Sequence, residues 1–311
     1  MAEKRIQQRV IRRAIDGMLL LDKPVGLSSN AALQTVRRLL NAEKAGHTGT
    51  LDPLASGLLP LTFGEATKFS QMLLDADKTY EAGVELGIAT TTGDAEGEIV
   101  ARAPVTTGET ELLATLACYT GDIEQRPPMY SALKRDGKPL YEYARAGIEL
   151  ERAPRRVTVS ALELLSFSGA RFVIRVTCSK GFYIRSLAMD IGAALGCGAH
   201  LHTLRRTRIG AFDLAASLTL ETLEAAKLDE RDALLAPVDT LVTAFPRLAL
   251  DQQAASQILH GQALRLAQTS ANEIVRLYGP AGFLGLGQWK EDGRLWPKRL
   301  VAIQETAQGT D

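Results

Sequence analysis

The sequence predicts an α+β fold in which helices pack on a mixed sheet, with a small β-rich module at the C-terminal end. The chain has 311 residues, of which 46% are hydrophobic and 23% charged, a composition typical of folded globular proteins. Residues 171–178 alternate apolar and polar side chains like a half-buried strand, and the chain then turns at Lys180 and Gly181 into a helix. Strands followed by helices recur without the regular repetition of a parallel α/β fold, which favours a mixed sheet.

The first expected elements are a strand, a helix and a loop. The segment GMLLLDK at 17–23 has the short apolar run of a buried strand. Residues 28–30 offer N-caps to a helix whose apolar side chains recur at helical spacing over residues 33–40. The loop that follows, GHTGTLDPLASGLLP at 46–60, contains three glycines and two prolines, which predicts an irregular, tightly turned backbone.

The later elements follow the same patterns. Helical spacing is found in residues 65–74 and 110–119, and residues 78–88 alternate like a half-buried strand. From about residue 125 to residue 156 no period is sustained, so this stretch is expected to leave the core. A boundary is expected within 241–251, and the segments EIVRLYG and GFLGLGQWK beyond it predict small strands joined by glycine turns.

The overall charge gives no general attraction to a polyanion, because the 36 basic side chains are balanced by 36 acidic ones. A nucleic acid would need local basic patches, for which three groups of cations are candidates. These groups are Lys4, Arg5, Arg9, Arg12 and Arg13; Arg152, Arg155 and Arg156; and Arg205, Arg206 and Arg208. The alternative is that they are ordinary solvated faces.

The cysteine pattern and the apolar runs indicate a cytoplasmic protein. Three cysteines without a CxxC pair suit neither a disulfide framework nor a structural zinc site. The N-terminus lacks the apolar stretch of a signal peptide, and no run is long enough to span a bilayer, so no membrane partner is expected.

Asp52 is the first candidate for chemistry. An Asp-Pro pair in a glycine-rich loop is most simply a turn. However, the glycines of residues 46–60 permit close approach by a ligand, and His47, Thr48 and Thr50 bring polar groups that a plain turn does not need. The loop has neither the lysine-hydroxyl pair of a P-loop nor a GxGxxG fingerprint, which argues against a nucleotide cofactor.

Several ordered motifs resemble the TruB family of pseudouridine synthases. They are LLLDKPVGLSS, GHTGTLDPLASGLLP with GEATKF, KTYEAGVELGIATTTGDAEGEI, QRPPMYSALKRDGKPLYEYARAG, SKGFYIRSLAMDIG and HLHTLRRTRIG. The resemblance runs densely from Gly17 to Phe212 and more weakly to the end. It implies the pseudouridine synthase fold, with a largely antiparallel central sheet flanked by helices, and an enzyme that isomerises uridine 55 in the T loop of tRNA.

The resemblance also implies roles for individual residues. Asp52 matches the family nucleophile, Arg185 the arginine that orients it, and Tyr80 the tyrosine that packs on the target base and takes part in proton transfer. Substrate contacts are implied for a second set: His47 with the flipped nucleotide, and Tyr183 and Leu204 with the uracil pocket. Loop support without a chemical step is implied for Lys23, Pro24 and Lys68.

The resemblance divides the chain into a basic N-terminal arm at 1–16, a catalytic domain at 17–246 and a PUA-like RNA-binding domain at 247–311. An insertion at about 125–152 is expected to clamp the T arm, while the last domain holds the acceptor end of tRNA. The expected protein is a monomer that needs neither a metal nor an organic cofactor.

Three alternatives remain open at this stage. The chain could bind and fold tRNA without catalysis, or act as a glycosidase with a second carboxylate among Asp75, Asp77 and Asp94. The HxH pair of His200 and His202, which on a strand would put both rings on one face, could bind zinc, but the sequence offers no third ligand.

Overall fold

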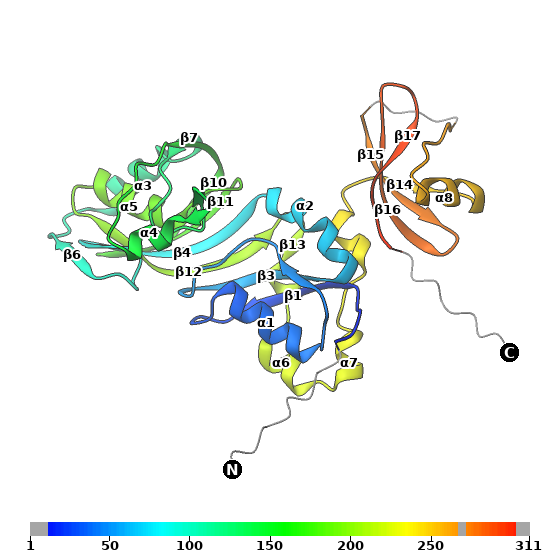
Figure 1. The fold of residues 1–311 in the computed structure, drawn as a ribbon. Helices are drawn as coiled ribbons and strands as arrows, with labels where there is room; N and C mark the ends of the chain where they lie inside the picture. Colours follow the sequence, from blue (N-terminus) through cyan, green and yellow to red (C-terminus); the bar gives the residue numbers. More distant parts are fainter. Residues whose placement is uncertain (1–11, 267–271, 303–311) are drawn as a thin grey trace, which may run out of the picture.

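The computed structural model describes residues 12–266 and 272–302, which form two large sheets with helices packed against them and two short hairpins (Figure 1). Most of the basic arm, with Lys4, Arg5 and Arg9, lies outside the described residues. The larger sheet consists of β1 (Gly17–Lys23), β2 (Ala45–His47), β3 (Ala55–Phe63), β4 (Lys78–Leu86), β7 (Gly121–Gln125), β10 (Arg155–Ser168), β11 (Arg171–Cys178), β12 (Ala199–Ile209) and β13 (Phe212–Asp213).

The larger sheet is mixed and largely antiparallel, which confirms the expected fold class. Its strands are ordered β1-β3-β12-β4-β11-β10-β7, with β2 on β3 and β13 on β12. Within it, only the β3–β12 pair among the described strands is parallel. The middle of the sheet therefore brings the start of β3 next to β12 and β4, strands that are far apart in sequence.

Helices cover this sheet in two groups (Figure 1). The elements are α1 (Ser29–Leu39), α2 (Ser70–Asp75), α3 (Glu109–Ala117), α4 (Leu140–Arg145), α5 (Ile184–Ala194), α6 (Leu220–Ala225) and α7 (Leu228–Asp232), with 3-10 turns η1 (Gly64–Phe69), η2 (Leu214–Ala216) and η3 (Val238–Val242). One core joins α3 and α5 to β4, β10, β11 and β12, and another joins α1 and α6 to β1 and β3. Burial of these apolar faces is the main force that holds the helices on the sheet.

Local sequence signals account for several element boundaries. Ser28 caps α1, because its side chain accepts a hydrogen bond from the backbone N–H of Ala31. The alternation predicted for residues 171–178 is seen in β11, where Phe172, Ile174 and Val176 are buried. The helix expected over residues 65–74 is instead split into η1 and α2, a 3-10 turn leading into a helix, as often happens at helix starts.

The C-terminal module is β-rich, as expected. It contains β14 (Arg247–Ala249), β15 (Ile274–Gly279), β16 (Gly282–Trp289), β17 (Leu295–Leu300) and α8 (Gln252–Leu259), with its own apolar core. The module rests on the first domain through Phe283 and Leu286, which pack with Phe69 and Leu73 of η1 and α2. The division into domains at residue 246 nevertheless stays a prediction.

The stretch between β7 and β10 carries only short elements, in keeping with its irregular sequence. A two-stranded hairpin, β8 (Lys134–Arg135) and β9 (Lys138–Pro139), leads into α4. A second hairpin, β5 (Ile88–Thr90) and β6 (Ile99–Arg102), projects from the end of β4. None of the helices in residues 12–266 and 272–302 has the length and apolar character needed to cross a bilayer.

Only part of the third basic group lies at the surface, where the side chains of Arg205 and Arg208 are 41% and 56% exposed. Arg206 is 1% exposed, because β12 is a central strand and its side chain points into the protein. Arg205 forms an ion pair with Asp22 at 2.7 Å. Arg13, from the first group, is also engaged, since it forms an ion pair with Asp232 at 2.6 Å. Arg206 is therefore unavailable to RNA, while Arg13 and Arg205 form partly exposed ion pairs of the kind that contribute little to stability.

Candidate active site

The glycine-rich loop that carries Asp52 connects β2 to β3 and is fixed by α1 and the β1–α1 turn. Ser29, in the first turn of α1, donates to the carbonyl of Leu51 at 3.0 Å and accepts from its N–H at 2.7 Å. The N–H of Gly26 donates to the carbonyl of Pro53 at 2.8 Å. Both neighbours of Asp52 are thus held by backbone contacts, which pre-organise the carboxylate.

The same loop makes a very close backbone approach to β12. Gly57 pairs with Arg206 in the parallel register and has a φ of +101°. A Cβ at this position would lie 2.3 Å from the carbonyl oxygen of Arg206. Because only glycine fits here, β3 and β12 can pair closely, with Leu204 opposite Ala55, three residues after Asp52.

Asp52 forms an ion pair with a buried arginine. Its Oδ2 lies 2.9 Å from Nη2 of Arg185, whose side chain is 7% exposed. Arg185 is itself held from other directions: it donates to the backbone carbonyls of Tyr130 at 2.6 Å and Thr92 at 3.3 Å, and its Nη1 lies 3.5 Å from Oδ2 of Asp94. The guanidinium therefore has little freedom to leave the carboxylate that it orients.

The pKa of Asp52 is raised above its usual range, because burial disfavours the charged carboxylate. The Arg185 cation opposes this effect, while the Asp94 carboxylate adds to it. The Asp52 side chain is still 40% exposed, so one face remains open to a substrate. Asp52 thus combines an accessible carboxylate with a fixed cation that favours its ionised form.

Tyr80 lies on β4 directly across from Arg206 in the antiparallel pairing. Burial raises the pKa of the Tyr80 phenol, an effect opposed by the neighbouring Arg206 guanidinium. Arg206 donates to the carbonyls of Leu58 at 2.8 Å and Gly49 at 3.3 Å. This buried cation therefore ties β3 and the Asp52 loop to the strand that carries Tyr80.

His47 and Thr48 bring unpaired polar atoms to the loop. Within the described residues, Nδ1 of His47 and Oγ1 of Thr48 are buried without a hydrogen-bond partner, so each can bond a water molecule or a bound ligand. Burial and the Arg206 cation lower the pKa of His47, so its imidazole is neutral near pH 7 and can both donate and accept a hydrogen bond.

The remaining residues expected at the site fall into two groups. Tyr183 immediately precedes α5, where the Gln125 side chain bonds both its N–H and its carbonyl; Leu204 pairs with Ala55 and Ala82 in the middle of the sheet. Leu204 therefore lies beside the start of β3, and Tyr183 lies beside the end of β7.

The expected supporting residues are engaged with backbone carbonyls. Lys23 is fully buried, donates to the carbonyls of Pro24 and Leu27 at 2.8 and 2.7 Å, and has its pKa lowered to about 8 by burial. Lys68 lies apart, where it bonds Glu65 and the carbonyl of Leu300 in β17. Lys68 therefore joins the two sheets rather than lining the site.

Three contributors were not identified from the sequence as parts of this site. Ser29, Asp94 and Arg206 act through contacts between elements distant in sequence, so only tertiary structure reveals them. Asp94 had been considered as a glycosidase acid, but its Oδ1 accepts from the Thr92 hydroxyl at 2.5 Å and the Glu96 N–H at 3.1 Å, while Oδ2 faces Arg185. Both oxygens are therefore engaged in holding the network.

Comparisons with known proteins identify consistent relatives. Three family models match the chain: "TruB family pseudouridylate synthase (N terminal domain)" over residues 37–184, "tRNA pseudouridylate synthase B C-terminal domain" over 185–243, and "Pseudouridine synthase II TruB, C-terminal" over 246–301. The tRNA pseudouridine synthase B of Azoarcus sp. (strain BH72) is 63% identical over 96% of this chain and 99% of that protein. The tRNA pseudouridine synthase B of Aromatoleum aromaticum is 62% identical over 97% of this chain and 98% of that protein.

Solved structures agree with these matches. A chain of an H/ACA RNP bound to a substrate RNA containing 2'-deoxyuridine has a TM-score of 0.70 and 25% identity, covering 93% of this chain and 86% of its own length. A chain of a Cbf5-Nop10-Gar1 complex has a TM-score of 0.67 and 28% identity, covering 93% of this chain and 84% of its own length. Both matches span the two sheets described above.

Proposed function

We propose that this chain, which belongs to the TruB family of pseudouridylate synthases, converts uridine 55 in the T loop of tRNA to pseudouridine with Asp52 as nucleophile. The family membership rests on relatives more than 60% identical over nearly the whole chain. Pseudouridine synthases are isomerases, and so is this protein. The target position and the role of Asp52 are the proposed part.

The reaction moves a base without any net change in composition. The bond from N1 of uracil to C1′ of the ribose breaks, the base turns over, and C5 forms the new bond to C1′ while its proton is lost and N1 gains one. A nucleophile that forms and then releases a covalent adduct can carry this sequence. An ionised Asp52 supplies that nucleophile whether it attacks C1′ or C6, and no metal or organic cofactor is required.

The observation that carries the proposal is the 2.9 Å ion pair between Asp52 and the buried Arg185. Burial raises the pKa of the Asp52 carboxyl, and the Arg185 cation opposes this rise and so favours the charged form. The backbone carbonyls of Tyr130 and Thr92, together with Asp94, keep that cation in place. The arrangement provides a charged nucleophile in a partly dry site.

The side chains around Asp52 suit a flipped base. Tyr80 can stack on the uracil ring and accept the C5 proton, and Tyr183 and Leu204 can line the pocket. A uridine stacked in an RNA loop must be extruded before it can react, at a cost of a few kcal/mol. The unpaired Nδ1 of His47 can hydrogen-bond the extruded nucleotide, which offsets part of this cost.

The rest of the RNA requires contacts away from Asp52. The insertion at 125–152 and α5 line an open pocket of about 560 Å³ that contains Arg126, Arg152, Glu149 and Asp190. Arg152 is paired with Glu149 at 3.1 Å, so Arg126 is the cation of this pocket that can bind a phosphate of the T arm. The C-terminal module, as a PUA-like domain, would hold the acceptor end. A monomer suffices for this arrangement, and tRNA as substrate implies the cytoplasm as compartment.

The test uses tRNA transcripts that carry tritium at C5 of every uridine. We expect the wild-type chain to release one equivalent of tritium per transcript and no free uracil, and to release none from a transcript in which cytidine replaces uridine 55. Release from the cytidine transcript would contradict the target position. Free uracil would indicate a glycosidase, and RNA binding without any release would indicate a non-catalytic folding protein.

A further inference from the structure

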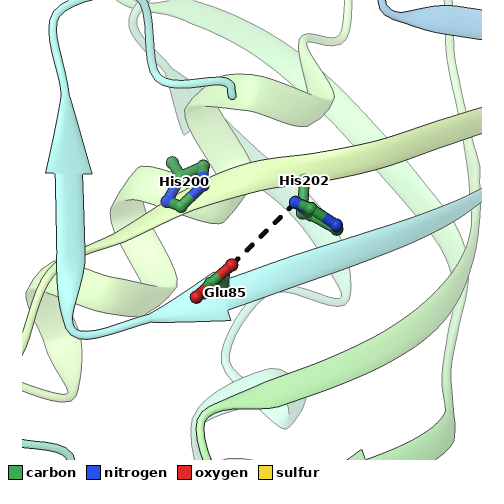
Figure 2. A group of neighbouring side chains, drawn as sticks. All are labelled: Glu85, His200 and His202. Atoms are coloured by element: carbon green, nitrogen blue, oxygen red, sulfur yellow. Dashed lines mark ion pairs between the residues drawn. The ribbon is translucent and has the colours of Figure 1, made fainter. Parts of the chain in front are cut away.

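Away from the candidate active site, three side chains of the kinds that bind metal ions meet at one end of β4 and β12. They are His200, His202 and Glu85 (Figure 2). One potential ligand atom from each lies within 4.8 Å of those of the other two. The sequence shows the HxH pair alone, since Glu85 is brought to it only by the pairing of β4 with β12.

The strand pairing explains how the three side chains come together. Glu85 and His200 are direct partners in the antiparallel register, and the register then shifts between Leu201 and Thr203. His202 is the extra residue at this bulge, a feature that changes the direction of a side chain. Its Nδ1 lies 3.9 Å from Oε2 of Glu85, and the dashed line in Figure 2 marks this pair.

His200 is held in the form that a metal ligand requires. The side chain is buried, with 5% exposure, and its Nδ1 lies 3.1 Å from the carbonyl oxygen of Ile88. Because a carbonyl can only accept, Nδ1 carries the hydrogen and Nε2 keeps its free lone pair. Metal-binding histidines typically donate their second nitrogen to a backbone carbonyl in this way.

We propose that His200, His202 and Glu85 form a binding site for a zinc-type divalent cation. Two imidazoles and one carboxylate are a set of donors that zinc accepts, with water in the remaining position. Imidazole donors favour zinc, cobalt or nickel over magnesium and calcium, which prefer oxygen ligands. His202 and Glu85 are 43% and 19% exposed, so both can move the short distance needed to bring the donors to about 2 Å from an ion.

Arg171 competes with the cation for Glu85. Its Nη2 lies 2.9 Å from the same carboxylate oxygen that faces His202, and the Arg171 side chain is 61% exposed. An exposed ion pair contributes little to stability, so a metal ion can displace the guanidinium. Replacing Arg171 should therefore strengthen metal binding at the proposed site. The same change should have no effect on an ion bound non-specifically to a surface histidine.

The proposed metal would cross-link β4 and β12 beside the segment that carries Asp94. Leu201, between the two histidines, donates its N–H to the carbonyl of Gly93 at 3.0 Å and accepts from the N–H of Ala95 at 2.9 Å. The site thus borders the Arg185 network without sharing any ligand with it. Metal binding and uridine isomerisation can therefore be measured separately, and an experiment can refute either proposal without refuting the other.

The test is a titration of the metal-free, full-length chain with Co²⁺, followed by its visible absorption, and then with Zn²⁺ in competition with a chromogenic chelator. We expect one ion per chain and a rise in the melting temperature with Zn²⁺. His202→Gln should weaken binding at least about tenfold, Arg171→Gln should strengthen it about threefold, and His260→Gln, at an exposed histidine in the other module, should leave it unchanged.

Two results would overturn the proposal. One is wild-type binding no tighter than that of His202→Gln. The other is equal weakening by His202→Gln and His260→Gln, the mark of adventitious surface binding. Because His202 is partly exposed, its variant is expected to fold, and circular dichroism checks this; Glu85→Gln provides a second variant that should weaken binding to a similar extent.

Discussion

Replacing Gly57 by alanine tests whether the close approach of β3 and β12 builds the site. The new Cβ would lie 2.3 Å from the carbonyl oxygen and 2.8 Å from the backbone nitrogen of Arg206, closer than such atoms can approach. Both contacts are backbone atoms, so no side chain can turn away to relieve them. The two strands must separate, or the residue must leave its φ of +101°.

The cost has two parts. A non-glycine residue held at positive φ costs about 1–3 kcal/mol, and overpacking against a rigid neighbour costs about 1–3 kcal/mol more. Together they predict a loss of about 2–6 kcal/mol, or a melting temperature lower by roughly 4–24 °C for a domain of this size. Since the shift separates Leu204 and Tyr80 from Asp52, the turnover rate should fall at least about tenfold at a temperature where the variant is folded.

Gly121→Ala is the matched control. Gly121 has a φ of +90°, but a Cβ built on it meets nothing within 4 Å, so the control carries the conformational strain without the clash. Calorimetry or thermal circular dichroism, together with tritium release below the transition, measures both effects. Equal melting temperatures and equal rates for the two variants would refute the role assigned to the close approach.

Three further predictions concern the arginine network and the N-terminal arm. Asp94→Asn should lower the turnover rate about 10- to 100-fold with little change in tRNA affinity, because Arg185 loses the charge that orients it. An unchanged rate in a stopped-flow assay would contradict the role of Asp94 in orienting Arg185. Asp52 must be ionised to act and its pKa is raised by burial, so activity should fall toward acid pH. Arg185→Gln removes the cation that opposes this rise and should therefore move the acid limb of the rate profile to higher pH. An unmoved limb would show that Arg185 does not control the ionisation of Asp52. Deleting residues 2–11, which carry a net charge of about +2, should reduce the slope of log affinity against log salt concentration by about 2. Equal slopes for the two chains in filter binding would show that these residues do not contribute to RNA binding.

Local patterns predicted part of the fold but missed the long strands β10 and β12, and residues 55–60 of the expected irregular loop belong to β3. The cap at Ser28 and the alternation of β11 are properties of adjacent residues, and both are found in the structure. The strand β17 was missed because its segment, LWPKRL, mixes proline and charges and lacks alternation. It is held by pairing with β16, which no local pattern reports.

The site was less accessible from the residues themselves. Asp52 in a glycine-rich loop with polar neighbours suggested either a turn or a ligand site, and its pairing with Arg185 followed from family resemblance rather than from spacing. Arg206 looked like part of a basic patch, since nothing local distinguishes a buried arginine on a central strand from an exposed one. Asp94 and Glu85 acquire their partners from strands and helices distant in sequence, so their roles depend on the sheet topology.

The most direct test of the account compares the wild-type chain with Asp52→Asn on the same tritiated tRNA. The substitution keeps the size of the side chain but removes the nucleophile, so tRNA binding should persist while tritium release falls at least about a thousandfold. Such a loss with unchanged affinity is the result that the account predicts. Release by Asp52→Asn at a rate near that of the wild type would contradict the central claim that Asp52 carries the reaction.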